Sequence, residues 1–339
     1  METSVPATSI TTSLNNTMKL NQTKITEALC ELSKVPAHPV FIFAYSLLFV
    51  ISLVLNCITM RVYFCTNQRV QSSVTVYLKN LAMADFFLCL CLPLRIAHNV
   101  KYSVTLQNIY CSFGATAFYL NMYASITFMD FIAANRYLKI VRPLETNALQ
   151  TVRFARLISI ATWLFLASTG SIYLFLFLQM SGGHNQSSED ISCESLHSLQ
   201  LSLAYKIIHC VSIALFIFVL VSLIFLYWRT VQKLREAQIS TQAVSSSQTF
   251  NKSKRNMLIL VVIFCVCFVP YHLVRLFDIF ISDCTTAQVF SILKELTVLL
   301  SVLNACVDPL IYFIFCKAFR AKLGLRKKKH MRSIVNLTP

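Results

Sequence analysis

Several ionisable residues of this sequence stand inside long apolar stretches, where a charge is costly. Asp85 and Asp308 are surrounded by aliphatic and aromatic residues, and Arg136 closes a third such stretch. A carboxylate at the centre of a membrane helix costs about 2.5 to 3.5 kcal/mol on insertion scales, so such groups face other helices and usually carry function. His272 and Arg275 are three residues apart, which places them on one helix face. Because arginine binds phosphate through paired charge-assisted hydrogen bonds, that face suits an anionic ligand.

The histidines show no catalytic or metal-binding pattern. An intramembrane hydrolase needs His, Asp or Ser clusters at metal or nucleophile spacing, and a transporter usually shows paired halves interrupted by Gly or Pro at matching places. The chain has five glycines and no visible internal repeat. We therefore predict that it is not an enzyme, and we keep a multi-span transporter as a remote alternative. Histidines without such spacing include His98, His184, His197, His209, His272 and His330.

Composition points to a membrane protein. Of the 339 residues, 56% are hydrophobic and 13% are charged, whereas an average soluble domain has about 25% charged residues. Apolar runs near the length that crosses a hydrocarbon core of about 30 Å recur along the chain. We predict an all-α bundle of seven transmembrane helices. The predicted spans are Val40–Phe64, Val74–Ala97, Asn108–Leu138, Leu157–Met180, Leu199–Trp228, Met257–Ile281 and Val289–Phe315.

The basic residues predict the orientation of these spans. Most of the 30 lysines and arginines follow spans one, three, five and seven, and cytoplasmic segments near span ends carry an excess of them. We therefore expect a plasma-membrane protein with an extracellular tail (1–39), a membrane domain (40–315) and a basic cytoplasmic tail (316–339). The net charge of +16 is then explained by anionic lipid beside the tail rather than by nucleic acid.

Two kinds of modification site fall on the predicted outer side. Three sequons predict glycosylation there, at Asn15, Asn21 and Asn185. Four cysteines face the oxidising compartment and allow three pairings, among which the sequence alone does not choose; they are Cys30, Cys111, Cys193 and Cys284. Cys316, just past the last span, is a candidate for palmitoylation.

The polar and aromatic residues of the spans resemble the rhodopsin-like (class A) G-protein-coupled receptors over about Val40 to Leu325. Their joint order is specific to that family. The resemblance implies a receptor that activates heterotrimeric G proteins, with arrestin and a receptor kinase as further partners and no cofactor. The markers are Asn56, Asp85, Asn135-Arg136-Tyr137, Trp163, Cys267-Phe268-Val269-Pro270 and Asp308-Pro309-Leu310-Ile311-Tyr312, followed by Phe319-Arg320 in a short amphipathic helix.

The resemblance also implies roles for individual residues. It places a sodium ion in the inactive state on four oxygen-bearing residues, Asp85, Ser125, Asn304 and Asp308; the alternative is a polar cluster that only packs helices. Pro270 and Pro309 are the expected bend points. The family's outer disulfide maps onto Cys111–Cys193, and a second bridge of the purinergic branch maps onto Cys30–Cys284.

Within the family, the outer halves of spans six and seven resemble the purinergic nucleotide receptors, particularly the ADP and UDP-sugar branch. This implies an anionic ligand bound by Tyr119, Tyr123, His272, Arg275 and Lys294. Asp278 departs from the pattern, because nucleotide-binding members carry tyrosine there, and it offers Arg275 a partner three residues away. The two tyrosines also fit ordinary core positions.

The sequence also supports a second class of ligand. Span four lacks proline and Asn135 replaces the usual acid, and both features resemble the platelet-activating-factor receptor. We therefore expect a nucleotide-like ligand, with a lysophospholipid or platelet-activating-factor-like lipid as the alternative. Without an acid beside Arg136, and with no Asp or Glu between Glu236 and Asp278, we also expect measurable signalling without ligand.

Overall fold

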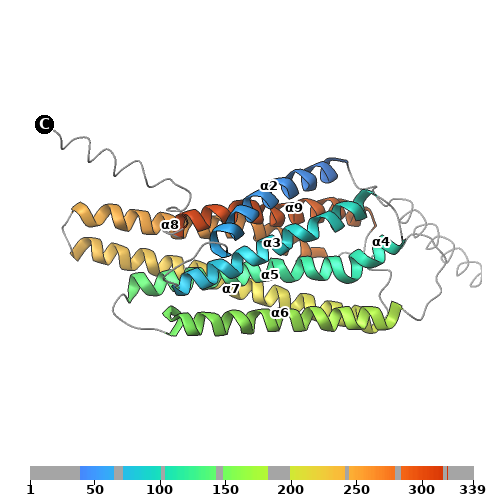
Figure 1. Cartoon of the computed structure of the whole chain (residues 1–339), viewed down its shortest axis with the longest axis horizontal. Helices are drawn as coiled ribbons and strands as arrows, with labels where there is room; N and C mark the ends of the chain where they lie inside the picture. Colours follow the sequence, from blue (N-terminus) through green and yellow to red (C-terminus); the bar gives the residue numbers. More distant parts are fainter. Residues whose placement is uncertain are drawn as a thin grey trace, which may run out of the picture.

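The structure is a computed structural model that describes residues 39–64, 72–100, 104–142, 148–181, 199–240, 244–278, 284–315 and 319. Within these ranges, seven long helices lie side by side along one axis (Figure 1). The predicted all-α bundle of seven transmembrane helices is confirmed. The helices are α2 (Pro39–Phe64), α3 (Ser73–Val100), α5 (Ala115–Val141), α6 (Val152–Ser181), α7 (Leu199–Ser240), α8 (Val244–Asp278) and α9 (Cys284–Phe315).

The two ends of the bundle are named here after the ends of its first helix. At the Pro39 end, α2, α5, α7 and α9 begin, and α3, α6 and α8 end. At the Phe64 end, α2, α5, α7 and α9 end. The short 3-10 helix η2 (Ala148–Gln150) lies in the connection between α5 and α6 at the Phe64 end.

Six of the seven helices are long and apolar enough to cross a membrane by length and composition, and α5 is the exception. It carries Asp130, Arg136 and Lys139, and its central residues are mostly buried. The reason is its position: α5 packs against α3, α6, α7 and α8. A helix covered by protein on most sides does not need a lipid-facing surface, so it tolerates polar residues that a peripheral helix does not.

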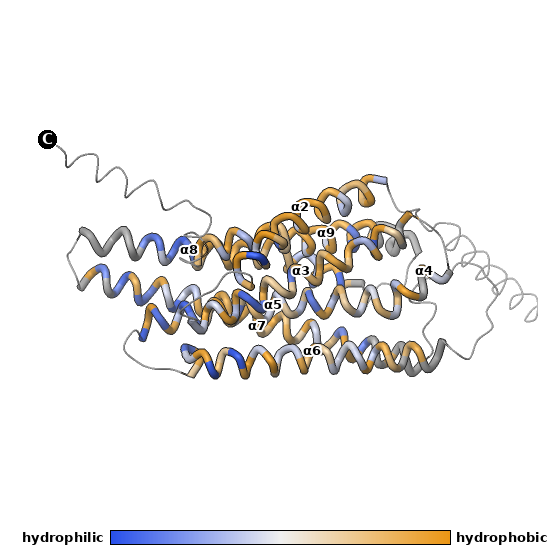
Figure 2. The backbone as a smooth tube through the Cα atoms, viewed as in Figure 1, coloured by the Kyte–Doolittle hydropathy of each residue, from blue (hydrophilic) through white to orange (hydrophobic). Residues whose placement is uncertain are grey.

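The predicted ends of spans five and six fall short of the helices. The α7 helix continues past Trp228 to Ser240, and α8 begins at Val244, well before Met257. These extensions project beyond the other helices (Figure 1) and contain many hydrophilic residues (Figure 2). Apolar content marks only the part of a helix that lies in lipid, whereas residues such as Gln, Lys, Leu and Arg continue it in water.

The third span contains a π-helical turn. The α4 helix (Val104–Ile109), the π turn η1 (Tyr110–Gly114) and α5 run end to end, because Ile109 and Ala115 on either side of η1 keep right-handed helical angles. A Cβ on Gly114 would lie 3.0 Å from Cδ2 of Tyr110 and 3.7 Å from Cβ of Leu94 on α3. The close distance is to the Tyr110 ring of the same turn, so glycine leaves room for that ring, while the distance to Leu94 is an ordinary contact. Such turns are frequent at functional sites.

Hydrogen bonds between helices satisfy some of the polar groups inside the bundle. Asn56 on α2 donates to the carbonyl of Ala305 on α9 at 2.8 Å. Trp163 on α6 donates to Oδ1 of Asn80 on α3 at 2.9 Å. With no water in the hydrocarbon region, such groups must find partners within the protein.

Pro270 lies inside α8 and Pro309 inside α9. A proline removes one backbone donor and leaves a carbonyl of the preceding turn without its helical partner. In this region, Ser301 on α9 donates to the carbonyl of Cys267, one turn before Pro270, at 3.1 Å. The disturbed turn of α8 is therefore bonded directly to α9.

The Asn56 contact generates a stability prediction. Asn56→Ala removes a buried donor to the Ala305 carbonyl and should cost about 1 to 3 kcal/mol, seen as a lower melting temperature of the detergent-solubilised protein. Cys57→Ala is the matched control, because Cys57 is exposed on the same helix. Equal melting temperatures for the two variants would contradict the role of this hydrogen bond.

Candidate functional site

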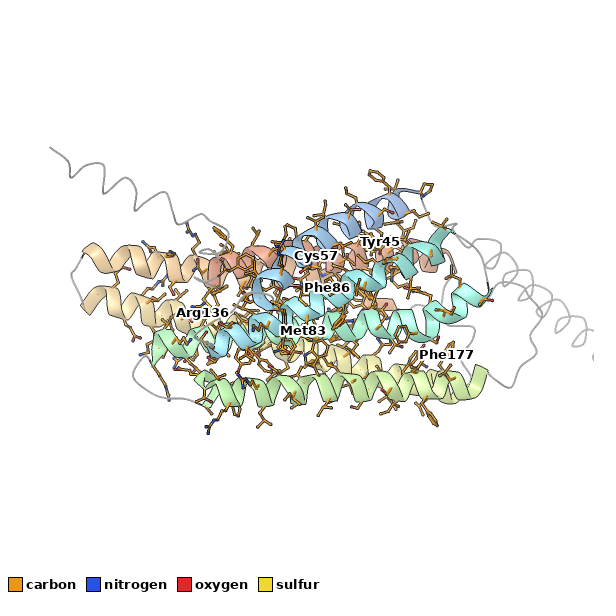
Figure 3. The ribbon with its side chains drawn as sticks, in the orientation of Figure 1. Tyr45, Cys57, Met83, Phe86, Arg136 and Phe177 are labelled. Carbon is orange, nitrogen blue, oxygen red and sulfur yellow. The ribbon has the colours of Figure 1, made fainter. Side chains whose placement is uncertain are left out.

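A cavity of about 570 Å³ opens within the bundle near the Pro39 end. Residues from α3, η1, α5, α6, α7, α8 and α9 line it. The volume lies in the range of small-molecule sites, which are usually largely preformed and mostly apolar with a few polar groups. Figure 3 shows Tyr45 and Phe177 toward this part of the bundle and Arg136 toward the opposite end.

An ion pair between a buried arginine and a partly exposed glutamate forms part of the wall of this cavity. Nη2 of Arg95 on α3 lies 2.8 and 2.9 Å from the two carboxylate oxygens of Glu295 on α9. Nη1 of Arg95 donates to the Tyr110 hydroxyl at 2.7 Å. The Tyr45 hydroxyl donates to Glu295 at 3.0 Å, and the Arg95 guanidinium lies 5.1 Å from the centre of the Tyr45 ring. One arginine thus joins α2, α3, η1 and α9.

Sequence reasoning missed this pair. The available signal was a lone arginine near the end of the apolar span Val74–Ala97. Its partner lies 200 residues away in the chain, so no local spacing rule connects them. Only the packing of α3 near α9 brings Arg95 and Glu295 together.

Two further cations line the cavity. Arg275 on α8 is largely buried, and its Nη2 lies 3.0 Å from Nε2 of His209 on α7. Lys294 on α9 is half-buried and also lines the cavity. Among the described residues of the lining, Arg95, Arg275 and Lys294 are cationic and Glu295 is anionic. A phosphate or carboxylate placed here would meet groups that bind it strongly.

Four of the five predicted ligand residues line the cavity: Tyr119, Tyr123, Arg275 and Lys294. The structure does not bring His272 to it. Nδ1 of His272 lies 2.8 Å from the Phe268 carbonyl and Nε2 lies 3.2 Å from the Tyr123 hydroxyl. Its ring stacks on Phe216 with centroids 3.7 Å apart. His272 lies on the same face of α8 as Arg275, but about one turn further from the Pro39 end. There it contacts the Tyr123 hydroxyl and does not line the cavity.

The predicted sodium residues meet at the centre of the bundle. Asp85 accepts hydrogen bonds from Ser125 at 3.0 Å and from Tyr312 at 2.6 Å. Asn304 donates to Asp308 at 2.9 Å, and the side chains of Asp85 and Asp308 contact one another. All five residues are inaccessible to solvent.

This central cluster is rich in oxygen atoms. Oδ1 of Asn304 and Oδ1 of Asp308 are buried and have no hydrogen-bond partner in the part of the chain that the structure describes. Carbonyl, hydroxyl and carboxylate oxygens are the ligands that hard cations prefer. Among the described residues, no group of three or more His, Cys, Asp or Glu side chains is placed to hold a metal ion. The donors of this cluster are two carboxylates, one amide and two hydroxyls.

At the Phe64 end, Asn135 and Arg136 contact different elements. Nδ2 of Asn135 donates to the Ser73 hydroxyl at 2.9 Å and to the Leu149 carbonyl at 3.0 Å. Arg136 donates to the carbonyl of Phe315, the last described residue of α9, and its guanidinium lies 4.7 Å from the centre of the Phe315 ring. Carbonyls at a helix C-terminus carry partial negative charge, which stabilises a nearby cation.

The sequence matches the family model described as "7 transmembrane receptor (rhodopsin family)" over residues 55–312. The chain belongs to the rhodopsin family of seven-transmembrane receptors. It is therefore a multi-pass plasma-membrane receptor that couples to G proteins, and it is neither an enzyme nor a transporter.

Curated relatives of the receptor point to the purinergic-like branch, as the resemblance predicted. Purinoceptor 14 of Bos taurus is 30% identical over 317 residues, which cover 90% of each chain. G-protein coupled receptor 87 of Mus musculus is 30% identical over 85% of this receptor and 80% of its own length. Probable G-protein coupled receptor 34 of Pan troglodytes is 28% identical over 86% of this receptor and 76% of its own length.

Several predicted sites of the receptor lie outside the described residues: Cys30, Cys193, Cys316, Arg320 and the three sequon residues Asn15, Asn21 and Asn185. The side chains of Asp278 and Cys284 are also not described, so the Arg275–Asp278 pair stays a prediction. Cys111 is buried and disulfide-bonded, but the partner lies outside the described residues, and both predicted pairings stay predictions.

Other predicted residues of the receptor lie in the core. Phe268 and Tyr312 are fully buried, and Tyr137 packs against the hydrophobic core. Phe319, the one described residue beyond α9, is buried beside Tyr63 and Tyr312, with ring centroids 5.8 and 6.2 Å away. The segment after α9 therefore returns to the bundle at Phe319.

The Arg95–Glu295 pair generates a prediction for receptor stability. Arg95→Leu leaves the Glu295 carboxylate without its cation and also removes the hydrogen bond to Tyr110. Because the Glu295 side chain is 34% exposed, the cost should lie below the roughly 3 to 5 kcal/mol of a fully buried pair. We expect a large loss of surface expression and of melting temperature. In Arg95→Leu/Glu295→Gln no charge is left unpaired, so most of the loss should be recovered. If the double variant is as unstable as Arg95→Leu, the charge pair is not what stabilises this end.

The contacts of Asn135 and Arg136 generate a prediction for basal signalling. Asn135→Asp supplies a carboxylate beside Arg136 and should lower ligand-independent G-protein activation; a shift of about 1.4 kcal/mol changes an inactive-to-active ratio ten-fold. Asn135→Ala is the control, because it also loses the donors to Ser73 and Leu149 but adds no charge. Guanine-nucleotide exchange would be measured at equal surface expression. A basal rate for Asn135→Asp equal to or above that of Asn135→Ala would refute this account.

Proposed function

We propose that this receptor binds an extracellular phosphate-bearing ligand in the cavity near the Pro39 end and transmits the signal to heterotrimeric G proteins at the Phe64 end. The observation that carries the proposal is the presence of Arg275 and Lys294 in the lining, while Glu295 is bonded to Arg95. The two cations lie on neighbouring helices, so one anionic group between them would receive hydrogen bonds from both.

The proposed orientation places the Pro39 end outside the cell and the Phe64 end in the cytoplasm. Cytoplasmic segments near span ends carry an excess of lysine and arginine. Basic residues of the hydrophilic extensions of α7 and α8 and of the α5–α6 connection support this orientation. These residues include Arg142, Arg153, Arg229, Lys233, Arg235, Lys252, Lys254 and Arg255. In this orientation the three sequons and the four cysteines Cys30, Cys111, Cys193 and Cys284 face the outside, where glycosylation and the two disulfides form.

A nucleotide is one ligand chemistry that fits the proposal. The relative from Bos taurus is named as a purinoceptor. In this cavity Tyr119 and Tyr271 lie with ring centroids 6.2 Å apart and give an aromatic surface on which a base can stack. A lysophospholipid is the second candidate, and the specific observation that favours it is the large apolar wall of the same cavity on α6 and α7.

The central polar cluster is proposed to hold a sodium ion in the inactive receptor, using Asp85, Ser125, Asn304 and Asp308. Support comes from the buried oxygen atoms of Asn304 and Asp308 that lack a hydrogen-bond partner among the described residues. Tyr312 is a fifth oxygen-bearing residue of the cluster through its bond to Asp85. Arrestin and a receptor kinase are proposed to bind at the cytoplasmic side, as further partners of the basic tail and the helix extensions.

The test of the proposed function begins with a panel of nucleotides and lysophospholipids, read out as calcium and cyclic-AMP responses in transfected cells. For the anion that responds, Arg275→Ala should remove a charge-assisted hydrogen bond worth about 1.5 to 3 kcal/mol, which is about ten-fold or more in potency. Lys294→Gln should act in the same direction. Lys206→Gln is the control, because Lys206 is exposed on α7 and does not line the cavity. Unchanged potency for Arg275→Ala at matched surface expression would refute the proposal.

A further inference from the structure

One acidic side chain inside the bundle takes no part in the sites described above. Asp130 lies on α5, between Ser125 of the central cluster and Arg136, which Figure 3 shows toward the Phe64 end. At a rise of about 1.5 Å per residue, Asp130 lies about 9 Å before Arg136 along the helix axis. The residue is only 7% exposed. An ionisable group at this depth is costly, and such residues usually carry function.

The carboxyl group of Asp130 has one polar partner. Ser222 on α7, which is half-buried, shares a hydrogen bond with it. The other carboxyl oxygen, Oδ1, is buried and has no hydrogen-bond partner among the described residues. Asp85 differs, because it accepts hydrogen bonds from both Ser125 and Tyr312. Asp130 thus lacks the partners that a buried carboxylate needs.

No charged side chain lies against this carboxyl group in the part of the chain that the structure describes. The helices α3, α6, α7 and α8 pack against α5, but none of their ionisable side chains forms an ion pair or a hydrogen bond with Asp130. On α5 itself, Arg136 contacts Phe315 instead. A neutral acid is far less costly in such surroundings than a carboxylate. The ionisable side chains of the neighbouring helix segments are Tyr77 and Asp85 on α3, Arg156 on α6, Tyr227 and Arg229 on α7, and Cys265 and Cys267 on α8.

The Ser222 contact belongs to the face along which α5 packs on α7. Two turns before Asp130 on that face, Tyr123 shares a hydrogen bond with Ser212 of α7. The remaining contact is apolar, since Val219 and other aliphatic residues of this part of α7 are buried. A neutral carboxyl group fits here, because its O–H can donate to the Ser222 hydroxyl. A carboxylate would need a cation or water to replace its lost hydration.

We propose that Asp130 is a proton-binding site, which holds a proton while α5 and α7 are packed and releases it when they separate. In the packed state, the oxygen beside Ser222 carries the proton and donates it in the hydrogen bond, which leaves Oδ1 as a neutral carbonyl oxygen. In the separated state, water enters, the O–H bond breaks, the proton passes to a water molecule and the carboxylate is solvated. The neutral acid therefore favours the packed bundle and the carboxylate favours the separated one.

The direction of the pH dependence follows from these two states. The packed receptor keeps a proton that the separated receptor has lost, so a rise in pH shifts the equilibrium toward separation. For one proton the limit is about ten-fold per pH unit. An aspartate in water ionises near pH 4 or so, so the dependence extends from about pH 5 up to the pH at which the packed acid itself ionises.

Infrared spectroscopy tests the proton directly. The receptor in nanodiscs would be compared with Asp130→Asn at neutral pH, and the difference spectrum should contain the carbonyl band of a protonated carboxylic acid. Glu236→Gln is the control, because Glu236 is an exposed acid on α7 and its difference spectrum should contain only carboxylate bands. If the Asp130→Asn difference spectrum also contains carboxylate bands alone, Asp130 is ionised and the proton site is refuted.

Thermal melting tests the link between the proton and packing without a ligand or a G protein. At about pH 5 the wild type and Asp130→Asn should melt at similar temperatures. Toward neutral pH the wild type should lose stability relative to Asp130→Asn and also to Asp130→Leu, since neither variant can ionise. Because leucine cannot bond to Ser222, a role limited to that hydrogen bond would make Asp130→Leu the least stable of the three at every pH. That result, or a constant difference between the wild type and Asp130→Asn, would overturn the link.

Basal guanine-nucleotide exchange then tests whether this separation bears on signalling. In nanodiscs both faces of the receptor meet the same buffer, so the measurement does not depend on the orientation in the cell. This step rests on the proposed coupling of G proteins at the Phe64 end, but not on the ligand cavity. We expect basal exchange by the wild type to rise several-fold per pH unit relative to Asp130→Asn with the same G protein. Parallel pH profiles, with the melting result intact, would refute the effect on signalling and leave the proton site and the proposed ligand untouched.

Discussion

The carboxyl groups of Asp85 and Asp308 touch at the centre of the bundle, where no water is available to solvate them, and the surrounding helices supply their partners. Ser125 comes from α5, and Tyr312 lies one turn after Asp308 on α9. The positions of α3, α5 and α9 must agree for these contacts to form at once. A displacement of any one helix leaves a buried carboxylate unpaired, which is costly in a low-dielectric interior. This constraint links the centre of the membrane to both ends of the bundle.

At each end of the bundle, charged side chains also need partners within the protein, and the partners differ between the two ends. Near Pro39, Arg95 and Glu295 form an ion pair beside the cavity that Arg275 and Lys294 also line. Near Phe64, Arg136 contacts the end of α9 through the Phe315 carbonyl. Both arrangements involve α9, which also carries Asp308. The α9 helix thus contributes to the cavity near Pro39, to the central cluster and to the contact of Arg136 near Phe64.

Much of the fold was predictable because the membrane imposes a length and a polarity on each spanning segment. The α5 helix was found from the sequence within the span Asn108–Leu138, although it fails a simple test of apolar composition because other helices enclose it. The parts of α7 and α8 near the Phe64 end were not predicted, because they lie beyond the apolar stretches and hydropathy could not show where those helices end. The missing information is which surfaces of a helix contact lipid, protein or water.

The sequence by itself determined the seven spans, the receptor family and a few of the residues around the cavity, because spacing along one helix and the cost of charges in lipid are local properties. Four of the five expected ligand residues line the cavity for that reason. The tertiary structure decided the rest of the lining, the pairing of Arg95 with Glu295 and the contact of His272 with Tyr123 away from the cavity. Each of these depends on how separate helices pack, and residues 200 positions apart become neighbours only when the bundle closes.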